Sequence, residues 1–384
     1  MDANDLSARA SDHITAWLLL AATPGITRRL PAIRRELDDP LSLWTQPRSV
    51  WQALGLGAKA CRWLARPDRA CADSTLRWLR ANPEKRRVLT CIDDAYPQLL
   101  LATADPPLLL LSEGPSSGLA EPMLAMVGSR QASPPGVELA NSFAHTLAGA
   151  GFTIISGLAH GIDGASHRGA LSAGGRTVAV LATGPDRVYP PDHHALSQAI
   201  ANRGQLLSEF TPGTPALRHH FPQRNRIIAG AAVGTLVVEA AERSGSLITA
   251  RLANEAGREV FAIPGSVRCP TTRGCHLLLR DGAVLVERPD DVVHALPALL
   301  GALCPAPERA ATSGSSGPEL ADTLPPQSGK VIDNLGHDPA TIEQIAARSG
   351  LTTETLCSIL PALEVRGFAC RFADGRYALL SRQE

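Results

Sequence analysis

The sequence contains few aromatic side chains, no net charge and no long apolar run. Phe, Trp and Tyr make up 4% of its 384 residues, so stacking on aromatic rings cannot be extensive. Lys and Arg together number 37, and Asp and Glu also number 37. With a formal charge of zero, any contact with nucleic acid must come from a local basic patch. The sequence has no run of about 20 apolar residues that could cross a bilayer, so we expect no membrane contact.

The cysteines and the N-terminal residues point to a reducing compartment. The eight cysteines contain no C-x-x-C spacing, so buried thiols are a better interpretation than a zinc site or a dithiol. The N-terminal residues lack the charged start, apolar centre and cleavage site of a signal peptide. We therefore expect a cytoplasmic protein, and the sequence predicts no metal and no cofactor.

Composition divides the chain into four parts, in keeping with the two or three domains expected for this length. Residues 1–85 are predicted to form a small helical domain, and residues 86–300 an α/β domain. Residues 301–328 are rich in Pro, Gly and Ser and read as a linker, because they offer too little apolar surface for a core. Residues 329–384 show three helical segments and a hairpin, which is typical of a winged helix.

The α/β domain is predicted from strands that alternate with helices. Residues 123–127 are an apolar run, residues 137–148 have apolar side chains at helical spacing, and residues 152–155 form a second apolar run. The same alternation continues to about residue 286 and includes a helix expected to begin around Asn225. This pattern favours a doubly wound, mostly parallel sheet that is covered by helices on both faces.

The first two strands of this domain end in small and hydroxyl-bearing residues. Gly128, Ser129 and Arg130 follow the first strand, and Ser156 and Gly157 end the second. The carboxyl ends of parallel strands meet at one edge of a sheet, where turn amides and helix N-termini bind anions. An arginine after a strand is more often only solvated, but together these turns predict a site for an anion, most simply a phosphate.

The most distinctive basic segment contains an aromatic residue. Arg224 and Arg226 follow Phe221 closely, and Arg-His-His precedes the segment. An aromatic ring beside two arginines suits stacking on a base while the charges pair with phosphates. The alternative is a helix start whose arginines are held by internal carboxylates, such as Glu239 or Glu242. The residues of this segment alone do not separate these interpretations.

A third hydroxyl-rich turn precedes a predicted helix. Ser244, Gly245 and Ser246 could hold an anion at the helix N-terminus or could only cap the helix, and capping is the commoner use. The chain has no G-x-G-x-x-G or G-x-x-x-x-G-K-[ST] sequence, which disfavours a dinucleotide or a P-loop nucleotide. It also lacks G-x-S-x-G and H-E-x-x-H, so an enzyme is less expected.

Two further sets of residues have a functional and a structural interpretation. His160, Asp163 and His167 could form a metal or acid/base set, although a capping Asp and two polar histidines are the commoner arrangement. The Gly-containing turns at residues 23–26 and 54–57 join short helices. Such turns can grip a DNA backbone through their amides, but more often they only connect the helices of a bundle.

In combination these segments resemble the DNA-processing protein A family, also called Smf. The resemblance covers about residues 90–290, and the helical N-terminal part and the winged-helix tail agree with the three-domain form of the family. The segments that carry it, in chain order, are 127–130, 156–163, 189–190, 208–209, 221–230, 238–240, 244–250 and 264–266.

The resemblance implies an extended Rossmann-like fold that binds single-stranded DNA without catalysis during natural transformation. Proteins of the family protect incoming single strands, load the RecA recombinase onto them and usually act as homodimers. The phosphate-binding arginine of the family corresponds to Arg130, and a basic residue that is often lysine corresponds to Arg176. The basic segment of the family corresponds to Phe221, Arg224, Asn225 and Arg226.

The chain departs from the family at two positions. His160 stands where many members have arginine, and His276 stands where asparagine is frequent. With few aromatic residues available, we expect binding that is mainly electrostatic, weakly sequence-selective and strongly dependent on salt. Two alternatives stay open: a nucleotide-hydrolysing enzyme that uses Glu239 or Glu242, and a regulator that binds duplex DNA through the winged helix.

Overall fold

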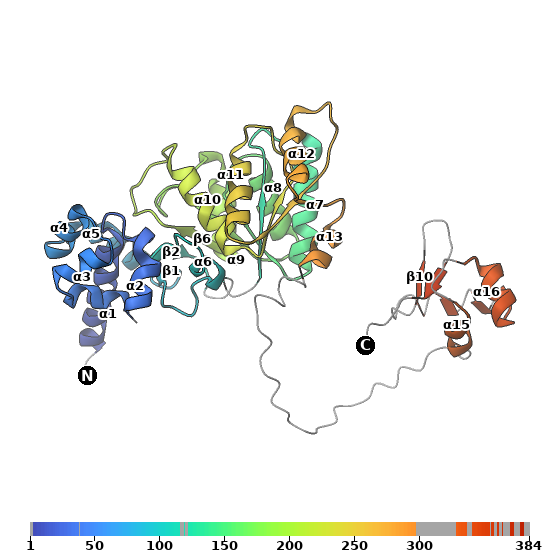
Figure 1. The fold of residues 1–384 in the computed structure, drawn as a ribbon, viewed down its shortest axis with the longest axis horizontal. Helices are drawn as coiled ribbons and strands as arrows, with labels where there is room; N and C mark the ends of the chain where they lie inside the picture. Colours follow the sequence, from blue (N-terminus) through green and yellow to red (C-terminus); the bar gives the residue numbers. More distant parts are fainter. Residues whose placement is uncertain are drawn as a thin grey trace, which may run out of the picture. The chain divides into compact units, whose positions relative to one another are not determined.

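A computed structural model of the chain describes two compact units (Figure 1), residues 1–307 and residues 308–384. Within the described ranges, no helix is long and apolar enough to span a membrane. The predicted linker falls almost entirely outside these ranges. The described residues are 3–37, 39–115, 119, 122–296, 328–335, 340–353, 355–356, 359–360, 363, 369–371 and 377–379.

The first part of the chain is helical, as predicted. Its core contains Trp17, Leu30 and Trp51, and it continues into Leu109 and Leu111 of the second strand of the sheet. The helices therefore pack on one end of the sheet and belong to the same compact unit. The helices are α1 (Ala3–Ala21), α2 (Leu30–Glu36), α3 (Arg48–Ala53), α4 (Ala58–Ala65) and α5 (Ala70–Ala81).

A nine-stranded sheet forms the centre of the first unit, with the strand order β1-β2-β6-β5-β4-β3-β7-β8-β9. β2 pairs antiparallel with both β1 and β6, and the other neighbouring strands are parallel, so the predicted mostly parallel sheet is confirmed. The strands are β1 (Arg86–Thr90), β2 (Leu109–Glu113), β3 (Met123–Val127), β4 (Thr153–Ser156), β5 (Thr177–Val180), β6 (Gln205–Ser208), β7 (Gly234–Val237), β8 (Glu259–Ala262) and β9 (Val284–Leu285).

Helices cover both faces of the sheet because the side chains of a strand alternate between its faces. On β3, Ala125 faces the core that α10 and α11 cover, whereas Leu124 and Met126 face the core that α7, α8 and α13 cover. The helices of this domain are α6 (Gln98–Leu101), α7 (Pro134–Gly149), α8 (Ile162–Ser172), α9 (His194–Arg203), α10 (His220–Ala231), α11 (Gly245–Glu255), α12 (Arg273–Arg280) and α13 (Pro289–Ala295).

One helix begins earlier than the sequence suggests. We expected a start around Asn225, but α10 begins at His220. Pro222 lies within its first turn, where a helix makes no internal hydrogen bond through the backbone N–H and therefore tolerates proline. The earlier start places Phe221, Arg224 and Arg226 on one continuous helix.

The second unit shows the elements of the predicted winged helix. The capping box is confirmed, since the Thr341 hydroxyl accepts from the Gln344 N–H and the Gln344 side chain accepts from the Thr341 N–H. Pro361 and the turn at residues 374–375 lie outside the described residues. The elements are α15 (Ser328–Leu335), α16 (Ile342–Ser349) and the antiparallel strands β10 (Ala369–Arg371) and β11 (Tyr377–Leu379).

Candidate nucleic-acid interface

A cavity of about 550 Å³ opens beyond the carboxyl ends of β3 and β7, between the first turns of α10 and α11. Nine residues predicted from the sequence line it, although they come from three separate segments of the chain. They are Gly128, Ser129, Arg130, Phe221, Arg224, Asn225, Ser244, Gly245 and Ser246.

The turn after β3 is fixed by backbone hydrogen bonds. The Ser129 N–H donates to the Glu239 carbonyl at 2.7 Å, and the Ile162 N–H donates to the Ser129 carbonyl at 3.2 Å. A Cβ at Gly128 would lie 2.5 Å from Ile162 Cγ1 and 2.8 Å from the Glu239 carbonyl oxygen. Only glycine allows this close approach, which sets the direction in which Arg130 leaves the turn.

Arg130 is exposed and lies against an aromatic ring of α10. Its guanidinium carbon is 4.6 Å from the centroid of the Phe221 ring, a cation–π contact. The Phe221 ring also meets the Tyr189 ring edge to face, with the centroids 5.7 Å apart. These contacts orient the guanidinium of Arg130 at the opening of the cavity, where two of its N–H groups can bind a phosphate.

Arg224 contributes a buried charge to the same cavity. Only 3% of the residue is exposed, and its Nη1 donates to the Val180 carbonyl at 3.2 Å. Its Nε is buried without a hydrogen-bond partner among the described residues. Burial lowers the pKa of Arg224 to about 10, and nearby Asp163 opposes this shift. The guanidinium therefore stays charged at neutral pH.

Asp163 also lines the cavity and balances the charge of Arg224. Its carboxylate accepts from the Gly157 N–H at 3.2 Å and from the Ala159 N–H at 3.4 Å. Burial raises the pKa of Asp163, whereas Arg224 and the two amides act in the opposite direction. Asp163 was predicted to cap a helix. It instead stabilises the turn that precedes α8, whose N-cap residue is Gly161.

The N-terminus of α11 forms another wall of the cavity. Ser244 is the N-cap residue, and its hydroxyl accepts from the Ser246 N–H at 3.3 Å. A Cβ at Gly245 would meet nothing within 4 Å, so the wall is open at this residue. Both interpretations of this turn are compatible, because Ser244 caps the helix while the dipole of α11 favours an anion in the cavity.

Two predicted residues support the cavity from below without lining it. The Ser156 hydroxyl donates to the Met126 carbonyl at 2.6 Å and is buried. A Cβ at Gly157 would lie 1.4 Å from Arg224 Nη1, so the absence of a side chain makes room for the guanidinium. Ser156 and Gly157 thus hold the site together, which differs from the predicted contact with a phosphate.

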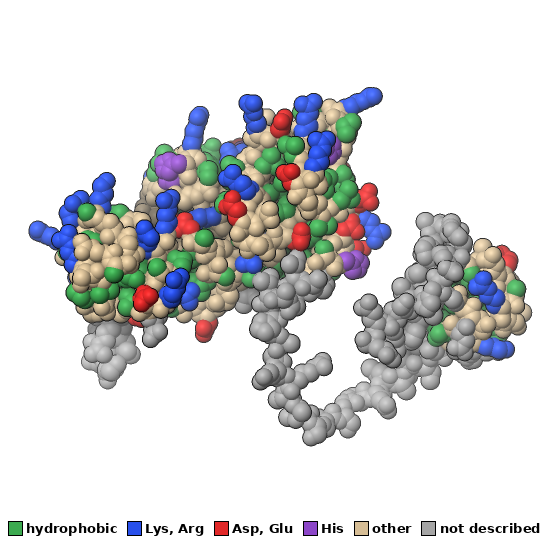
Figure 2. Space-filling view, in the orientation of Figure 1, with side chains coloured by type: hydrophobic (Ala, Val, Ile, Leu, Met, Phe, Trp, Pro, Cys, Tyr) green, Lys and Arg blue, Asp and Glu red, His purple; other side chains and the backbone are tan. Residues whose placement is uncertain are grey.

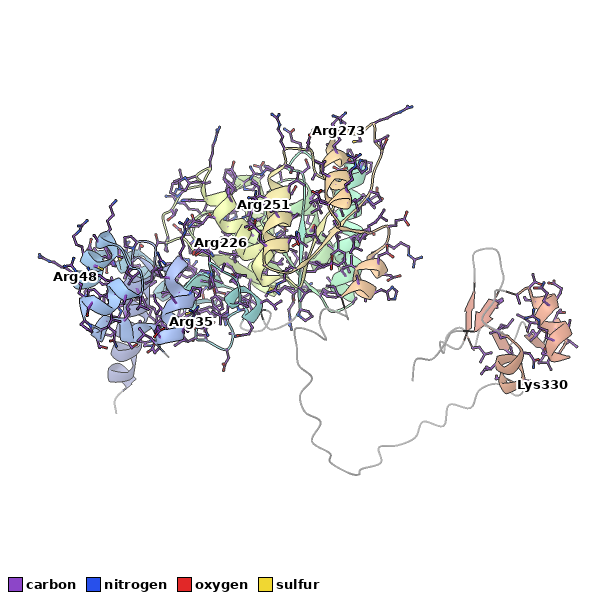
Figure 3. The ribbon with its side chains drawn as sticks, viewed as in Figure 1. Arg35, Arg48, Arg226, Arg251, Arg273 and Lys330 are labelled. Carbon is purple, nitrogen blue, oxygen red and sulfur yellow. The ribbon has the colours of Figure 1, made fainter. Side chains whose placement is uncertain are left out.

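Two other predicted residues lie elsewhere. Arg176 immediately precedes β5, so it stands at the amino ends of the parallel strands, at the opposite edge of the sheet from the cavity. Arg226, which is labelled in Figure 3, pairs with Glu209. Its Nε lies 3.7 Å from a carboxylate oxygen of Asp105. Internal carboxylates therefore hold Arg226, as the alternative interpretation of this basic segment expected. They belong to Glu209 and Asp105 and not to Glu239 or Glu242.

Sequence reasoning missed a cation of the cavity, the exposed Arg243. Arg243 immediately precedes the Ser-Gly-Ser turn that had been singled out, and an arginine next to a predicted anion-binding helix start was the available signal. Gln131 also lines the cavity and was missed. Its N–H donates to the Ser129 hydroxyl at 3.1 Å, within the Gly-Ser-Arg turn.

Two of the residues considered for catalysis, Glu239 and His167, are engaged in structural contacts. Glu239 is buried and accepts from the Ser133 N–H at 2.9 Å, which ties it to the start of α7. His167 is buried, with its Nδ1 2.7 Å from the Thr177 hydroxyl. Among the described residues, no three His, Cys, Asp or Glu side chains are grouped to hold a metal ion.

The two glycine turns of the helical part face a common cleft. The cleft has a volume of about 510 Å³ and contains Gly25, Gly55 and Gly57 together with Arg28 and Arg29. Figure 2 shows Lys and Arg side chains projecting from the surface of this helical part. The structure thus brings the turns together beside two exposed arginines.

Comparisons with known proteins agree with the fold. The family model described as DNA recombination-mediator protein A matches residues 87–297, and the DprA winged helix domain matches residues 315–375. The chain is 39% identical over 335 residues to Protein Smf of Escherichia coli, which covers 87% of each chain. It is 46% identical over 202 residues to the DNA processing protein DprA of Streptococcus pneumoniae, covering 53% of this chain and 71% of the relative.

Solved structures show the same fold. The X-ray structure of Streptococcus pneumoniae DprA has a TM-score of 0.63 and 36% identity, and the match covers 73% of this chain and 96% of the other. The DprA structure from Helicobacter pylori, described as showing a unique single-stranded DNA binding mode, has a TM-score of 0.50 and 26% identity, covering 56% and 96%. The chain therefore belongs to the DNA recombination-mediator protein A family, whose members include DprA and Smf proteins.

Proposed function

We propose that the chain binds single-stranded DNA at the cavity between α10 and α11 and acts as a recombination mediator in natural transformation. One observation carries the proposal: Arg130, Arg224 and Arg243 converge with the N-terminus of α11 on one cavity. A protein without net charge has few other ways to attract a polyanion than such a local concentration of positive charge.

The cavity suits a flexible single strand because its donors lie at different depths. Arg130 and Arg243 are exposed and meet the backbone first, whereas Arg224 is buried and reaches only a phosphate that enters the cavity. A duplex holds its phosphates on a stiff cylinder, and its bases face inward. A single strand can bend to place one phosphate inside and leave its bases free for other contacts. The Helicobacter pylori relative, whose structure is described as showing single-stranded DNA binding, supports this assignment.

The proposal is tested by anisotropy of a labelled 20-nucleotide strand, with unlabelled single strand and the matching duplex as competitors. The single strand should displace the probe at concentrations at least tenfold lower than the duplex. Equal displacement by both would assign the protein to duplex DNA, and no binding of the probe would contradict the proposal.

The proposed mediator protects incoming strands in the cytoplasm and loads RecA onto them. This part rests on membership of the family. A direct test uses RecA filament formation on a strand precoated with single-strand-binding protein, followed by RecA ATPase activity. The protein should shorten the lag before ATP hydrolysis, and an unchanged lag would contradict RecA loading.

A homodimer is also proposed, and two exposed leucines support it. Leu285 of β9 is 51% exposed, and Leu277 of α12 is 36% exposed. β9 is the outer strand of the sheet, and β8 is its only pairing partner among the described strands. An apolar sheet edge is suited to a second copy of the same surface. Light scattering should give the mass of a dimer for the wild type and of a monomer for Leu285→Arg. A wild-type monomer would contradict the dimer.

We propose that the chain is not an enzyme. The engagement of Glu239 by Ser133 supports this, because the carboxylate considered as a catalyst is held away from the lining of the cavity. Incubation with nucleoside monophosphates should release no free base. Release that disappears in Glu239→Gln would establish the alternative, a nucleotide-hydrolysing enzyme. Sequence-specific duplex binding retained by residues 325–384 alone would establish the other alternative, a winged-helix regulator.

A further inference from the structure

Tyr189 is the one Phe, Trp or Tyr side chain of the described part of the chain that is exposed. It is 47% exposed, whereas the other described aromatic side chains are buried or half-buried. Its ring therefore offers a free face, near the cavity, on which a base can stack. No hydrogen bond joins its hydroxyl to another described residue, so an internal bond does not account for its position.

The ring lies at the border of the cavity. Tyr189 meets Phe221 edge to face, with the centroids 5.7 Å apart and the planes at 63°, and Phe221 lines the cavity. Arg130 lies on the Phe221 ring, with the guanidinium carbon 4.6 Å from its centroid. The Phe221 ring is therefore in contact with two neighbours and is half-buried, while Tyr189 keeps an open surface.

The loop that carries Tyr189 is held in place by the neighbouring loop. The Thr183 hydroxyl donates to the Arg187 carbonyl at 2.7 Å, and the Ser208 hydroxyl donates to the Thr183 carbonyl at 2.6 Å. The Gly213 N–H donates to Asp186 at 2.8 Å. These bonds hold residues 183–187, which lead to Tyr189, so the backbone that precedes the ring is fixed.

We propose that Tyr189 is the stacking surface for an unpaired base of the strand whose phosphate occupies the cavity, and that Phe221 positions Tyr189 and Arg130. This inference rests on the proposed function. It also changes the role of Phe221, which the sequence suggested as the ring that stacks on a base. A single strand supplies the free base face that stacking needs, whereas the bases of an intact duplex already stack on their neighbours.

Tyr189 would act on the bases and Arg130 on the phosphates, and the two roles can be separated experimentally. Loss of a stacking ring lowers affinity about tenfold. It leaves the slope of log K against log salt unchanged, because no phosphate contact is lost. Loss of Arg130 should make that slope shallower. The readouts therefore distinguish the two residues.

The experiment measures anisotropy of the full-length wild type, Tyr189→Ala and Tyr189→Phe with a labelled strand and with an abasic strand of equal length. Tyr189→Ala should bind the normal strand about tenfold more weakly with an unchanged salt slope, and Tyr189→Phe should bind like the wild type. On the abasic strand all three should be equal. A strand with 2-aminopurine should lose fluorescence on binding the wild type but not Tyr189→Ala.

Leu139→Ala is the matched control, because Leu139 is a large apolar side chain of similar exposure on α7. It should leave affinity unchanged. Wild-type affinity in Tyr189→Ala, or an equal loss on the abasic strand, would overturn the inference while leaving the proposed function intact. A wild type that binds neither strand would overturn both, and the two failures are thereby distinguished.

Discussion

The guanidinium of Arg130 lies 4.6 Å from the centre of the Phe221 ring, although the two residues come from different βα units. This contact joins the turn after β3 to the first turn of α10. It places the exposed arginine at the cavity that Phe221 lines. The position of Arg130 therefore depends both on a glycine-containing turn and on an aromatic ring.

Replacing Arg130 by lysine should separate the contribution of its positive charge to DNA binding from that of its planar guanidinium. Lys keeps the positive charge but loses the planar fork that lies on Phe221 and binds a phosphate through two donors. We expect Arg130→Lys to bind a single strand more weakly than the wild type, with a nearly unchanged salt slope. Anisotropy across a salt series measures both quantities, and wild-type affinity in Arg130→Lys would show that the charge alone suffices.

Gly157, which lies against Arg224, and Gly245, which lines the cavity, provide a matched pair of substitutions. In Gly157→Ala the new methyl group would lie 1.4 Å from Arg224 Nη1, so the buried guanidinium must move. In Gly245→Ala the methyl group meets nothing within 4 Å. Gly157→Ala should therefore lose both thermal stability and DNA affinity, and Gly245→Ala should keep its stability. Equal melting temperatures for the two variants would contradict this account of Arg224.

Arg226 and Arg243 should respond in opposite ways to substitution by alanine. Arg226→Ala leaves the carboxylate of Glu209, whose side chain is only 13% exposed, without its partner. Breaking a buried ion pair costs about 3–5 kcal/mol. Arg243→Ala removes an exposed cation of the cavity, so it should weaken DNA binding without changing stability. Urea unfolding and anisotropy of both variants check this. A stable Arg226→Ala protein that no longer binds DNA would return Arg226 to the interface.

The contrast between the two arginines of α10 shows what could be predicted from sequence. The strands and the hydroxyl-rich turns were predicted correctly, because apolar runs ending in Gly and Ser are local patterns. Residues two apart on a helix point about 200° from each other, so Arg224 and Arg226 cannot both enter one cavity. The expected start near Asn225 left Arg224 before the helix and concealed this consequence.

The other differences have equally direct reasons. Arg176 was assigned through the resemblance, although a residue that precedes a parallel strand lies at the edge opposite the carboxyl ends. Arg243 was missed because attention fell on the hydroxyls that follow it. The contact of Phe221 with both Arg130 and Tyr189 joins a helix to two separate loops, and no pattern within one segment indicates it.

His167 should make stability dependent on pH. Burial lowers its pKa from 6.5 to about 3, so the folded protein keeps the ring neutral. The unfolded chain binds a proton below about pH 6.5, and stability contributed by the neutral ring is therefore lost as the pH falls from 6.5 toward 3. The slope is about 1.4 kcal/mol per pH unit. Between pH 7 and pH 5, urea unfolding should show a smaller loss for His167→Gln than for the wild type, and equal losses would contradict this.

The measurement that tests the central claim most directly is the salt dependence of single-strand binding by the wild type and by the double variant Arg130→Ala/Arg243→Ala. Each phosphate contact contributes about 0.7 to the slope of log K against log salt for a single strand. If the cavity is the binding site, the variant should bind far more weakly at low salt, with a slope shallower by about 1.4. An unchanged affinity and slope would place single-stranded DNA elsewhere on the protein and contradict the account.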